Sequence, residues 1–281
     1  MTEEKNRHAG SLACGKERKT ETKTEGKKDM QHFSLIGRQL SHSFSKVLFE
    51  ERFGSEGLRY DLVELESLDG LRDEVEQRGL DGFNVTIPYK TEILPLLDAV
   101  DDTARRIGAV NTVRVDRNGG AMRLVGFNTD APAFAESIGP LLRPHHRKAL
   151  ILGTGGASRA VGHALETLGI DCLWVSRHPA ALPAHDSLRA KTVDYATAYA
   201  LADQRTVIVN ATPVGMFPNC SQSPWQRPEL LTPQHLCFDL VYNPSPTRFL
   251  QEAALLGATT CDGLAMLHLQ AQKSWHIWGF E

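Results

Sequence analysis

The sequence lacks closely spaced cysteines, long apolar runs and an excess of charge of one sign. Its five cysteines include no C-x-x-C pair and no Cys/His spacing typical of zinc ligands, so we predict neither a disulfide framework nor a metal site. No apolar run is long enough to span a bilayer. The formal net charge is only -3, which argues against nucleic acid or an anionic membrane as a partner. We therefore expect a cytoplasmic protein that acts on a small molecule.

The first 29 residues have almost no large apolar side chains. Lys, Glu, Thr and Gly alternate there, and such a segment cannot bury enough apolar surface to offset the entropy of ordering. We predict a disordered tail over residues 1–29. Met30, directly after it, is a candidate start of the natural chain.

The rest of the chain has an ordinary globular composition, with 41% hydrophobic and 23% charged residues in the whole sequence. Residues 30–127 alternate strand patterns such as HFSLIG with helical patterns such as KVLFEERF. SLDGLRDEVEQRG opens with Ser67 and closes with Gly79 as a capped helix does. Two later strand patterns flank RNGG, a hairpin turn sequence. This order predicts an α/β domain with a mainly parallel sheet.

A second α/β series occupies residues 128–257. Strand patterns ALILG, DCLWV, TVIVN and LCFDL alternate with helical segments, and an apolar-rich segment over residues 258–281 is predicted to form a C-terminal helix that returns to the first domain. The predicted fold class is therefore α/β, with two α/β domains.

Three glycines, Gly153, Gly155 and Gly156, lie between a buried strand and a helix. Glycines there allow a tight turn and close approach of a pyrophosphate to the helix N-terminus. Ser158 stands where the third glycine of G-x-G-x-x-G is usual. We predict a dinucleotide site in a Rossmann-type domain; the alternative is a glycine turn that binds no ligand.

The next strand ends in Ser176 and Arg177, with no acid before Asp186. NAD sites usually carry an acid at this strand end for the ribose hydroxyls, whereas a 2′-phosphate favours a cation. The pattern therefore favours NADP over NAD, unless Arg177 is merely a solvated loop residue.

Two polar clusters could supply proton-transfer groups. GFNVTIPYK contains Asn84, Thr86 and Lys90, and GFNTD contains Asn128 and Asp130. Chemistry alone leaves each ambiguous, because an isolated lysine is often a surface charge and an aspartate after Asn-Thr is often a helix cap.

Taken together, motifs from about Phe33 to the C-terminus resemble the shikimate dehydrogenase family. They are IGRQLSHSFS, NVTIPYK, GAVNT, GFNTD, GTGGASR, VNATPVGM, DLVYNPSPT and DGLAMLHLQA, in family order. The resemblance implies a substrate-binding domain over residues 30–127, joined by the helix 258–281, and an NADP-binding domain over residues 128–257. It also implies reversible NADPH-dependent reduction of 3-dehydroshikimate to shikimate, a step of chorismate and aromatic amino acid biosynthesis.

Site residues follow from the resemblance, motif by motif. Lys90 and Asp130 would be the catalytic pair. The implied substrate contacts are Ser43, Ser45, Asn84, Thr86, Asn111, Asp130, Tyr242 and Gln270. The implied cofactor contacts are Gly153, Thr154, Gly155, Gly156, Ala157, Ser176, Arg177, Thr212, Gly263 and Met266. Without the resemblance, Met266 in a helical apolar stripe is more typical of core packing.

The serine segment also has a physical rationale. Ser43 and Ser45 lie two residues apart near a predicted helix start, so in extended backbone both hydroxyls would face one carboxylate. Ser41 and His42 are not predicted to contact substrate. A quinate/shikimate dehydrogenase that uses NAD or both cofactors is the alternative enzyme, and a noncatalytic protein that senses cofactor or shikimate is a further alternative. We expect a monomer or homodimer.

Overall fold

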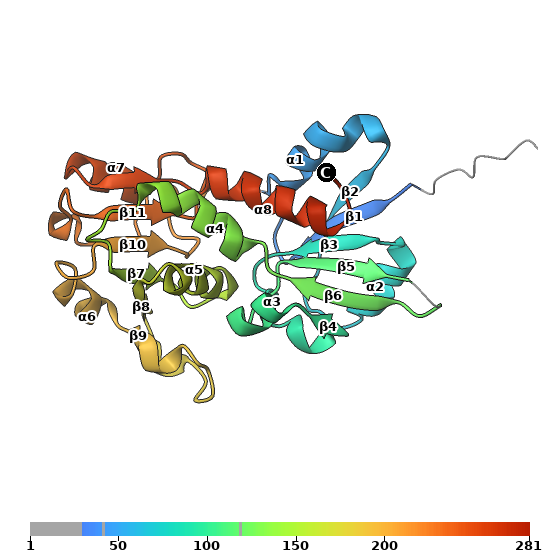
Figure 1. Ribbon diagram of the computed structural model, residues 1–281, viewed down its shortest axis with the longest axis horizontal. Helices are drawn as coiled ribbons and strands as arrows, with labels where there is room; N and C mark the ends of the chain where they lie inside the picture. The colour runs from blue at the N-terminus through green and yellow to red at the C-terminus, as the bar shows by residue number, and fades with distance from the viewer. Residues whose placement is uncertain (1–29, 41–42, 118–119) are drawn as a thin grey trace, which may run out of the picture.

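The computed structural model describes residues 30–40, 43–117 and 120–281. The predicted tail 1–29 and the residues Ser41 and His42 lie outside the described residues. Two α/β domains lie side by side, and a long C-terminal helix runs from one to the other (Figure 1). The predicted fold class is confirmed. No helix in the described ranges is long and apolar enough to cross a membrane.

The sheet of the first domain is mixed. Its strand order is β2-β1-β3-β5-β6-β4. The pairs β1/β2, β1/β3 and β4/β6 are parallel, whereas β5 runs antiparallel to both of its neighbours, β3 and β6. The strands are β1 (His32–Gly37), β2 (Arg59–Glu64), β3 (Gly82–Val85), β4 (Ala99–Val100), β5 (Thr112–Asp116) and β6 (Arg123–Phe127).

The α-helices among the described residues of this half of the chain are α1 (Ser45–Phe53), α2 (Leu71–Arg78) and α3 (Asp102–Ile107). The helix α2 ends at Gly79, as predicted, but its N-cap is Gly70 and not Ser67. Ser67 instead accepts a hydrogen bond from the Asp69 amide in the preceding turn. A serine in a local turn of this kind competes with the helix for the same amides.

The sheet of the second domain is wholly parallel, in the order β12-β11-β10-β7-β8-β9. Helices on both faces bury its central strands, which explains their continuous apolar runs. The elements are α4 (Asp130–Ile138), β7 (Lys148–Leu152), α5 (Gly156–Thr167), β8 (Asp171–Val175), β9 (Thr192–Val193), α6 (Tyr195–Ala200), β10 (Val207–Asn210), β11 (Leu236–Asp239), α7 (Arg248–Leu255) and β12 (Thr259–Cys261).

The C-terminal helix α8 spans Leu264–Ile277, so its predicted start at residue 258 is wrong. Residues before it form β12, which pairs with β11 and completes the second sheet. The far end of α8 reaches the first domain, where the Trp278 ring stacks on Phe33 at 4.6 Å between centroids. The indole N–H of Trp278 donates to the Val113 carbonyl at 3.0 Å. Gly82 permits this approach, because a Cβ atom there would overlap the indole.

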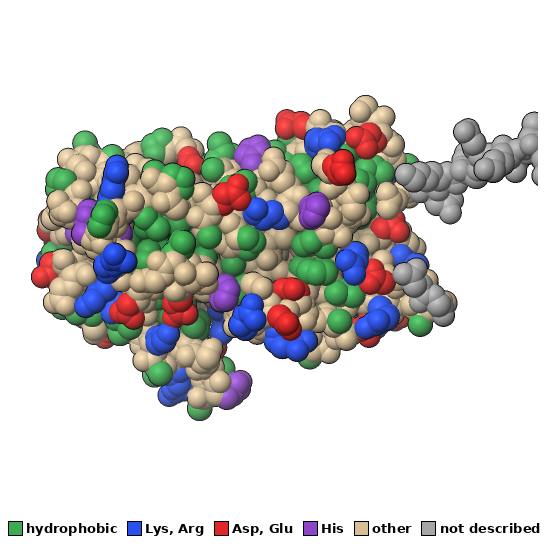
Figure 2. All heavy atoms as spheres, viewed as in Figure 1, with side chains coloured by type: hydrophobic (Ala, Val, Ile, Leu, Met, Phe, Trp, Pro, Cys, Tyr) green, Lys and Arg blue, Asp and Glu red, His purple; other side chains and the backbone are tan. Residues whose placement is uncertain are grey.

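Charged side chains of both signs are interspersed on the face that Figure 2 shows, in agreement with the small net charge. Short 3-10 helices connect the larger elements: η1 (Gly54–Glu56), η2 (Leu94–Leu96), η3 (Gly139–Leu141), η4 (Pro179–Ala181), η5 (Arg189–Lys191) and η6 (Pro228–Leu230).

Candidate active site

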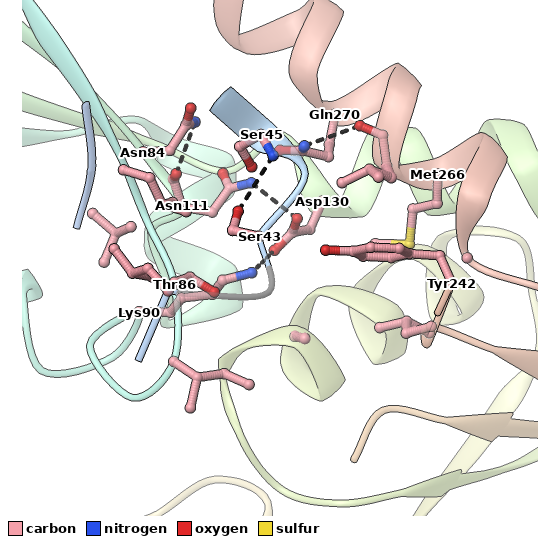
Figure 3. Close-up of a pocket in the computed structure, with 18 of the residues that line it drawn as sticks. Ser43, Ser45, Asn84, Thr86, Lys90, Asn111, Asp130, Tyr242, Met266 and Gln270 are labelled. Carbon is pink, nitrogen blue, oxygen red and sulfur yellow. Dashed lines mark hydrogen bonds and ion pairs between the residues drawn. The ribbon is translucent and has the colours of Figure 1, made fainter. Parts of the chain in front are cut away.

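A cavity of about 290 Å³ lies where the first domain, the second domain and α8 meet. Polar side chains from all three parts point into it (Figure 3). It brings together all the residues predicted for catalysis and substrate binding, and three of those predicted for the cofactor. The predicted residues that line it are Ser43, Ser45, Asn84, Thr86, Lys90, Asn111, Asp130, Ala157, Tyr242, Gly263, Met266 and Gln270.

The ammonium of Lys90 and the carboxylate of Asp130 form an ion pair in this cavity. Lys90 Nζ lies 2.7 Å from Asp130 Oδ2, and the two side chains are only 14% and 6% exposed. Lys90 is thus no solvated surface charge. Asp130 is the first residue of α4. The side chain that accepts a hydrogen bond from the Ala131 amide, in the first turn of α4, is Asn128 and not Asp130. The Asp130 carboxylate is therefore not a helix cap and is available to Lys90.

Asn111 fixes the other oxygen of this carboxylate. Its Nδ2 donates to Asp130 Oδ1 at 2.9 Å and to Thr129 Oγ1 at 2.8 Å. Its Oδ1 accepts the Thr129 amide at 2.7 Å. Asn111 donates to one oxygen of the Asp130 carboxylate and Lys90 donates to the other, so the carboxylate is held between an amide group and an ammonium group.

Ser43 and Ser45 both line the cavity, but their predicted extended geometry is wrong. Phe44, between them, has helical backbone angles, and α1 begins at Ser45. The Ser45 amide donates to Ser43 Oγ at 3.3 Å. The two hydroxyls are therefore brought to the cavity by the first turn of a helix, where unpaired amides and the helix dipole favour an anion.

Two further predicted contacts complete this side of the cavity. The Tyr242 ring meets Phe44 edge-on at 5.5 Å between centroids, and burial raises the pKa of the Tyr242 phenol, although a hydrogen bond with the Phe44 backbone opposes the shift. Tyr242 is therefore a neutral hydroxyl near neutral pH. Gln270, on α8, donates to the Leu267 carbonyl at 3.0 Å and presents the rest of its amide to the cavity.

The glycine turn lies beside the Lys90–Asp130 ion pair. Gly153 follows β7 with φ at 103°, a conformation that favours glycine, and a Cβ atom there would lie 2.9 Å from Thr212 Cγ2. The Thr212 hydroxyl donates to Asn210 Oδ1 at 2.7 Å, which fixes this neighbour of the turn. A Cβ atom at Gly155 would meet open space. The backbone of the turn and the first amides of α5 can therefore accept a pyrophosphate, and the residues fit a dinucleotide.

Ser158, in place of the third glycine, does not disturb the contact between helix and sheet. It is fully buried and its hydroxyl donates to the Gly155 carbonyl at 2.7 Å. Close packing of α5 on the sheet is served one turn later by Gly162, where a Cβ atom would overlap the Trp174 ring. In the sequence, Gly162 stands inside a helical pattern, and a glycine there indicates close packing; it was not among the predicted site residues.

The strand β8 leads to Ser176 and Arg177, as predicted from the sequence pattern. Arg177 is exposed, and among the described residues it has no acidic partner. Asp186 instead pairs with Arg159 on α5 and accepts the Leu188 amide at 2.9 Å. Although burial opposes it, these hydrogen bonds hold the pKa of Asp186 below its ordinary value. Asp186, the first acid after β8, is thus already paired with Arg159, and Arg177 is available to bind an anion.

Gly263 and Met266 lie at the start of α8. A Cβ atom at Gly263 would overlap the Leu240 carbonyl, so only glycine fits there. Met266 is 6% exposed; it packs in the core of the second domain and also lines the cavity. The cavity lining further includes Met216 and Leu240, which the sequence motifs did not indicate as site residues.

Fold and site together define a two-domain α/β protein in which a dinucleotide-type glycine turn faces a lysine–aspartate pair. A family model described as the shikimate dehydrogenase substrate binding domain matches residues 35–113. A shikimate dehydrogenase (NADP(+)) of Methanocaldococcus jannaschii is 36% identical over 259 residues, covering 87% of this chain and 89% of that protein. The chain belongs to the shikimate dehydrogenase family, as its motifs predicted.

Solved structures agree with this assignment. The shikimate 5-dehydrogenase of Thermus thermophilus, in complex with NADP(H) and shikimate, matches with a TM-score of 0.75 and 37% identity, over 89% of this chain and 94% of that chain. The quinate dehydrogenase of Corynebacterium glutamicum, in complex with NAD, matches with a TM-score of 0.76 and 28% identity, over 89% and 94% of the two chains.

Proposed function

We propose that this protein is an NADP-dependent shikimate dehydrogenase, which reversibly reduces 3-dehydroshikimate to shikimate in the formation of chorismate and aromatic amino acids. The observation that carries the proposal is the ion pair of Lys90 and Asp130, enclosed in a cavity beside the glycine turn. Relatives named as NADP-dependent shikimate dehydrogenases, over most of the chain, support the same activity.

Lys90 is the proton-transfer group in this proposal. NADPH supplies the hydride when it is bound. In the reduction, the Lys90 ammonium stabilises the charge that develops on the substrate carbonyl oxygen and gives that oxygen a proton. In the oxidation, neutral Lys90 takes the proton from the substrate hydroxyl. Asp130 holds the ammonium in place at 2.7 Å and accepts a hydrogen bond from a ring hydroxyl.

The remaining polar groups bind and orient the substrate. Ser43 and Ser45, at the start of α1, receive the carboxylate, and Tyr242 lies nearby as a neutral hydroxyl donor. Asn84, Thr86, Asn111 and Gln270 surround the ring hydroxyls. Since Ser43, Ser45 and Lys90 line one cavity, it can hold an acid that carries its carbonyl and its carboxyl group on the same ring.

The cofactor is held by the second domain. Gly153, Thr154, Gly155, Gly156 and Ala157 surround the pyrophosphate, and Ser176 and Arg177 receive the adenosine 2′-phosphate. Within the described ranges the guanidinium of Arg177 has no acidic partner, and Asp186 is paired with Arg159; both observations support NADP over NAD. Gly263 and Met266 would contact the nicotinamide, and Thr212 would be a further cofactor contact. We place the domain division at residues 30–127 and 128–257, with α8 joined to the first domain.

Quinate oxidation with NAD is the alternative activity, favoured by the likeness to a quinate dehydrogenase in complex with NAD. A noncatalytic sensor of shikimate or cofactor is disfavoured, because a sensor has no need of the enclosed Lys90–Asp130 pair. A cytoplasmic monomer or homodimer accords with the small net charge and the scattered cysteines.

The test is an initial-rate assay of nicotinamide absorbance with shikimate and quinate, each against NADP and NAD. The proposal predicts that shikimate with NADP gives the highest kcat/KM of the four combinations. A higher value for quinate with NAD would favour the alternative, and no turnover in any combination would contradict an enzyme of this class.

A further inference from the structure

A buried tyrosine outside the cavity contacts the substrate site from behind. Tyr60, on β2, is 3% exposed and does not line the cavity. Its ring packs among aromatic residues, with Phe49 at 4.8 Å between centroids. Its hydroxyl donates to Asn84 Oδ1 at 2.8 Å, across the intervening strand β1. The hydroxyl is thus the polar end of a side chain whose ring is packed in the hydrophobic core.

The hydrogen bonds of Asn84 fix which end of its amide faces which partner. Its Nδ2 donates to the Asn111 carbonyl at 3.2 Å, and this partner can only accept. The same nitrogen lies 3.0 Å from Ser274 Oγ, whose own proton goes to the Gln270 carbonyl. Both Nδ2 protons therefore have protein acceptors. Only Oδ1 retains a lone pair for a ligand, so Asn84 can accept from a substrate hydroxyl but has no proton left to donate to it.

Tyr60 also lies next to the carboxylate end of the cavity. The side chain of Ser45, the first residue of α1, approaches the same phenol. Burial raises the pKa of the Tyr60 phenol, so the hydroxyl keeps its proton over the range in which enzymes of this kind are assayed. A single hydroxyl group therefore borders two predicted substrate contacts that come from different elements, β3 and α1.

We propose that Tyr60 is a positioning residue for substrate binding: its hydroxyl holds the Asn84 amide in one orientation, with Oδ1 as the acceptor that is left for the ligand. It acts through Asn84 and does not touch the substrate. The Lys90–Asp130 pair is held separately, by Asn111. Loss of the Tyr60 hydroxyl should therefore weaken binding of the substrate and leave proton transfer nearly intact.

The test variant is Tyr60→Phe, which removes the hydroxyl and keeps the ring in its aromatic cluster. We expect the KM for shikimate to rise roughly 3- to 10-fold, the loss of about one buried hydrogen bond, while kcat and the KM for NADP change less than about twofold. The matched control is Tyr199→Phe, which removes a phenol that accepts the Gln226 amide in the second domain. It should change neither KM. An unchanged shikimate KM in folded Tyr60→Phe, or an equal rise of both KM values, would overturn the inference.

A double-mutant cycle tests whether Tyr60 acts through Asn84. In an Asn84→Ala background the amide is already absent, so Tyr60→Phe should add almost no further rise of the shikimate KM. A rise equal to that in the wild-type background would contradict the proposal. If Tyr60→Phe does not fold, Ser274→Ala takes its place, since it removes another of the partners that orient the same amide.

The inference rests on the proposed function, but the two fail differently. Absence of turnover by the wild-type protein would contradict the proposed function alone. Titration calorimetry of shikimate with wild-type protein and Tyr60→Phe then still tests the inference, which expects weaker binding by the variant; equal affinities would overturn it.

Discussion

Gly156, the first residue of α5, faces Lys90 so closely that a Cβ atom at Gly156 would lie 2.5 Å from Lys90 Cβ. The glycine turn of the second domain therefore contacts Lys90 of the first domain through its backbone. The absence of a side chain at Gly156 thus leaves room for Lys90, to which we assign proton transfer. This contact brings the glycine turn next to the cavity that Lys90 lines.

Replacement of Gly156 by alanine should displace Lys90 or the turn, because no real Cβ contact is as short as 2.5 Å. A displacement of about 1 Å at a reacting group can cost on the order of 100-fold in rate. We expect a loss of kcat/KM of roughly this size, measured by initial rates. Gly139→Ala is the control, since its Cβ would meet nothing within 4 Å. Full activity of Gly156→Ala would show that the contact is unimportant.

Replacement of Arg177 by aspartate should shift the cofactor preference from NADP toward NAD. A charge-assisted hydrogen bond to a phosphate is worth about 1.5–3 kcal/mol, so kcat/KM for NADP should fall by roughly 10- to 100-fold, whereas that for NAD should not fall. The ratio of the two kcat/KM values is the measurement. Arg147→Asp, in an exposed loop before β7, is the control for added negative charge. An unaltered ratio in Arg177→Asp would show that Arg177 does not bind the 2′-phosphate.

Asp239, at the end of β11, should make the protein less stable as pH rises from about 4 to about 6. Burial raises the pKa of this carboxyl from 3.8 to about 6, although hydrogen bonds from the Val241 amide, Thr247 and Asn210 oppose the shift. The unfolded chain loses the proton first, so the folded state binds more protons over this interval and its stability falls with pH. Each pKa unit corresponds to about 1.4 kcal/mol, which gives a loss of about 3 kcal/mol.

The measurement is the free energy of unfolding by denaturant at pH 4 and pH 7, for the wild-type protein and Asp239→Asn. The variant should lack this part of the decline. Asp194→Asn, at an exposed helix cap whose pKa is lowered by hydrogen bonds with Thr197, should not remove it. If the free energy of unfolding falls equally for Asp239→Asn and for the wild-type protein, ionisation of Asp239 in the folded protein does not reduce its stability.

The sequence predicted the parts of this protein that have a local signal. Gly153 and its neighbours stand between a strand and a helix, and the structure places them there. Lys90 and Asp130 are 40 residues apart in the chain, and only the family motifs, not their chemistry, indicated that they form a pair. The mixed pairing of the first sheet could be expected from the hairpin sequence, since a short turn forces two strands to run antiparallel.

Other features depend on tertiary contacts that no local pattern records. Tyr60 stands between polar residues, as many strand residues do, and no motif near it in the sequence indicates a contact with Asn84. Ser274 lies in a helical stripe and becomes a hydrogen-bond partner only because α8 crosses back to β3. The helix boundary at residue 264 was missed because β12 has only three residues, Thr259–Cys261, too few to show a period.

The most direct test of the account is shikimate oxidation by Lys90→Ala beside the wild-type protein. General acid–base catalysis by a positioned group contributes about 10²- to 10⁴-fold, so kcat should fall by at least about 100-fold while shikimate still binds in a calorimetric titration. Lys191→Ala removes an exposed lysine that pairs with Glu166 at 2.6 Å, and it should retain wild-type turnover. Turnover by folded Lys90→Ala at the wild-type rate would contradict the central claim that Lys90 transfers the proton.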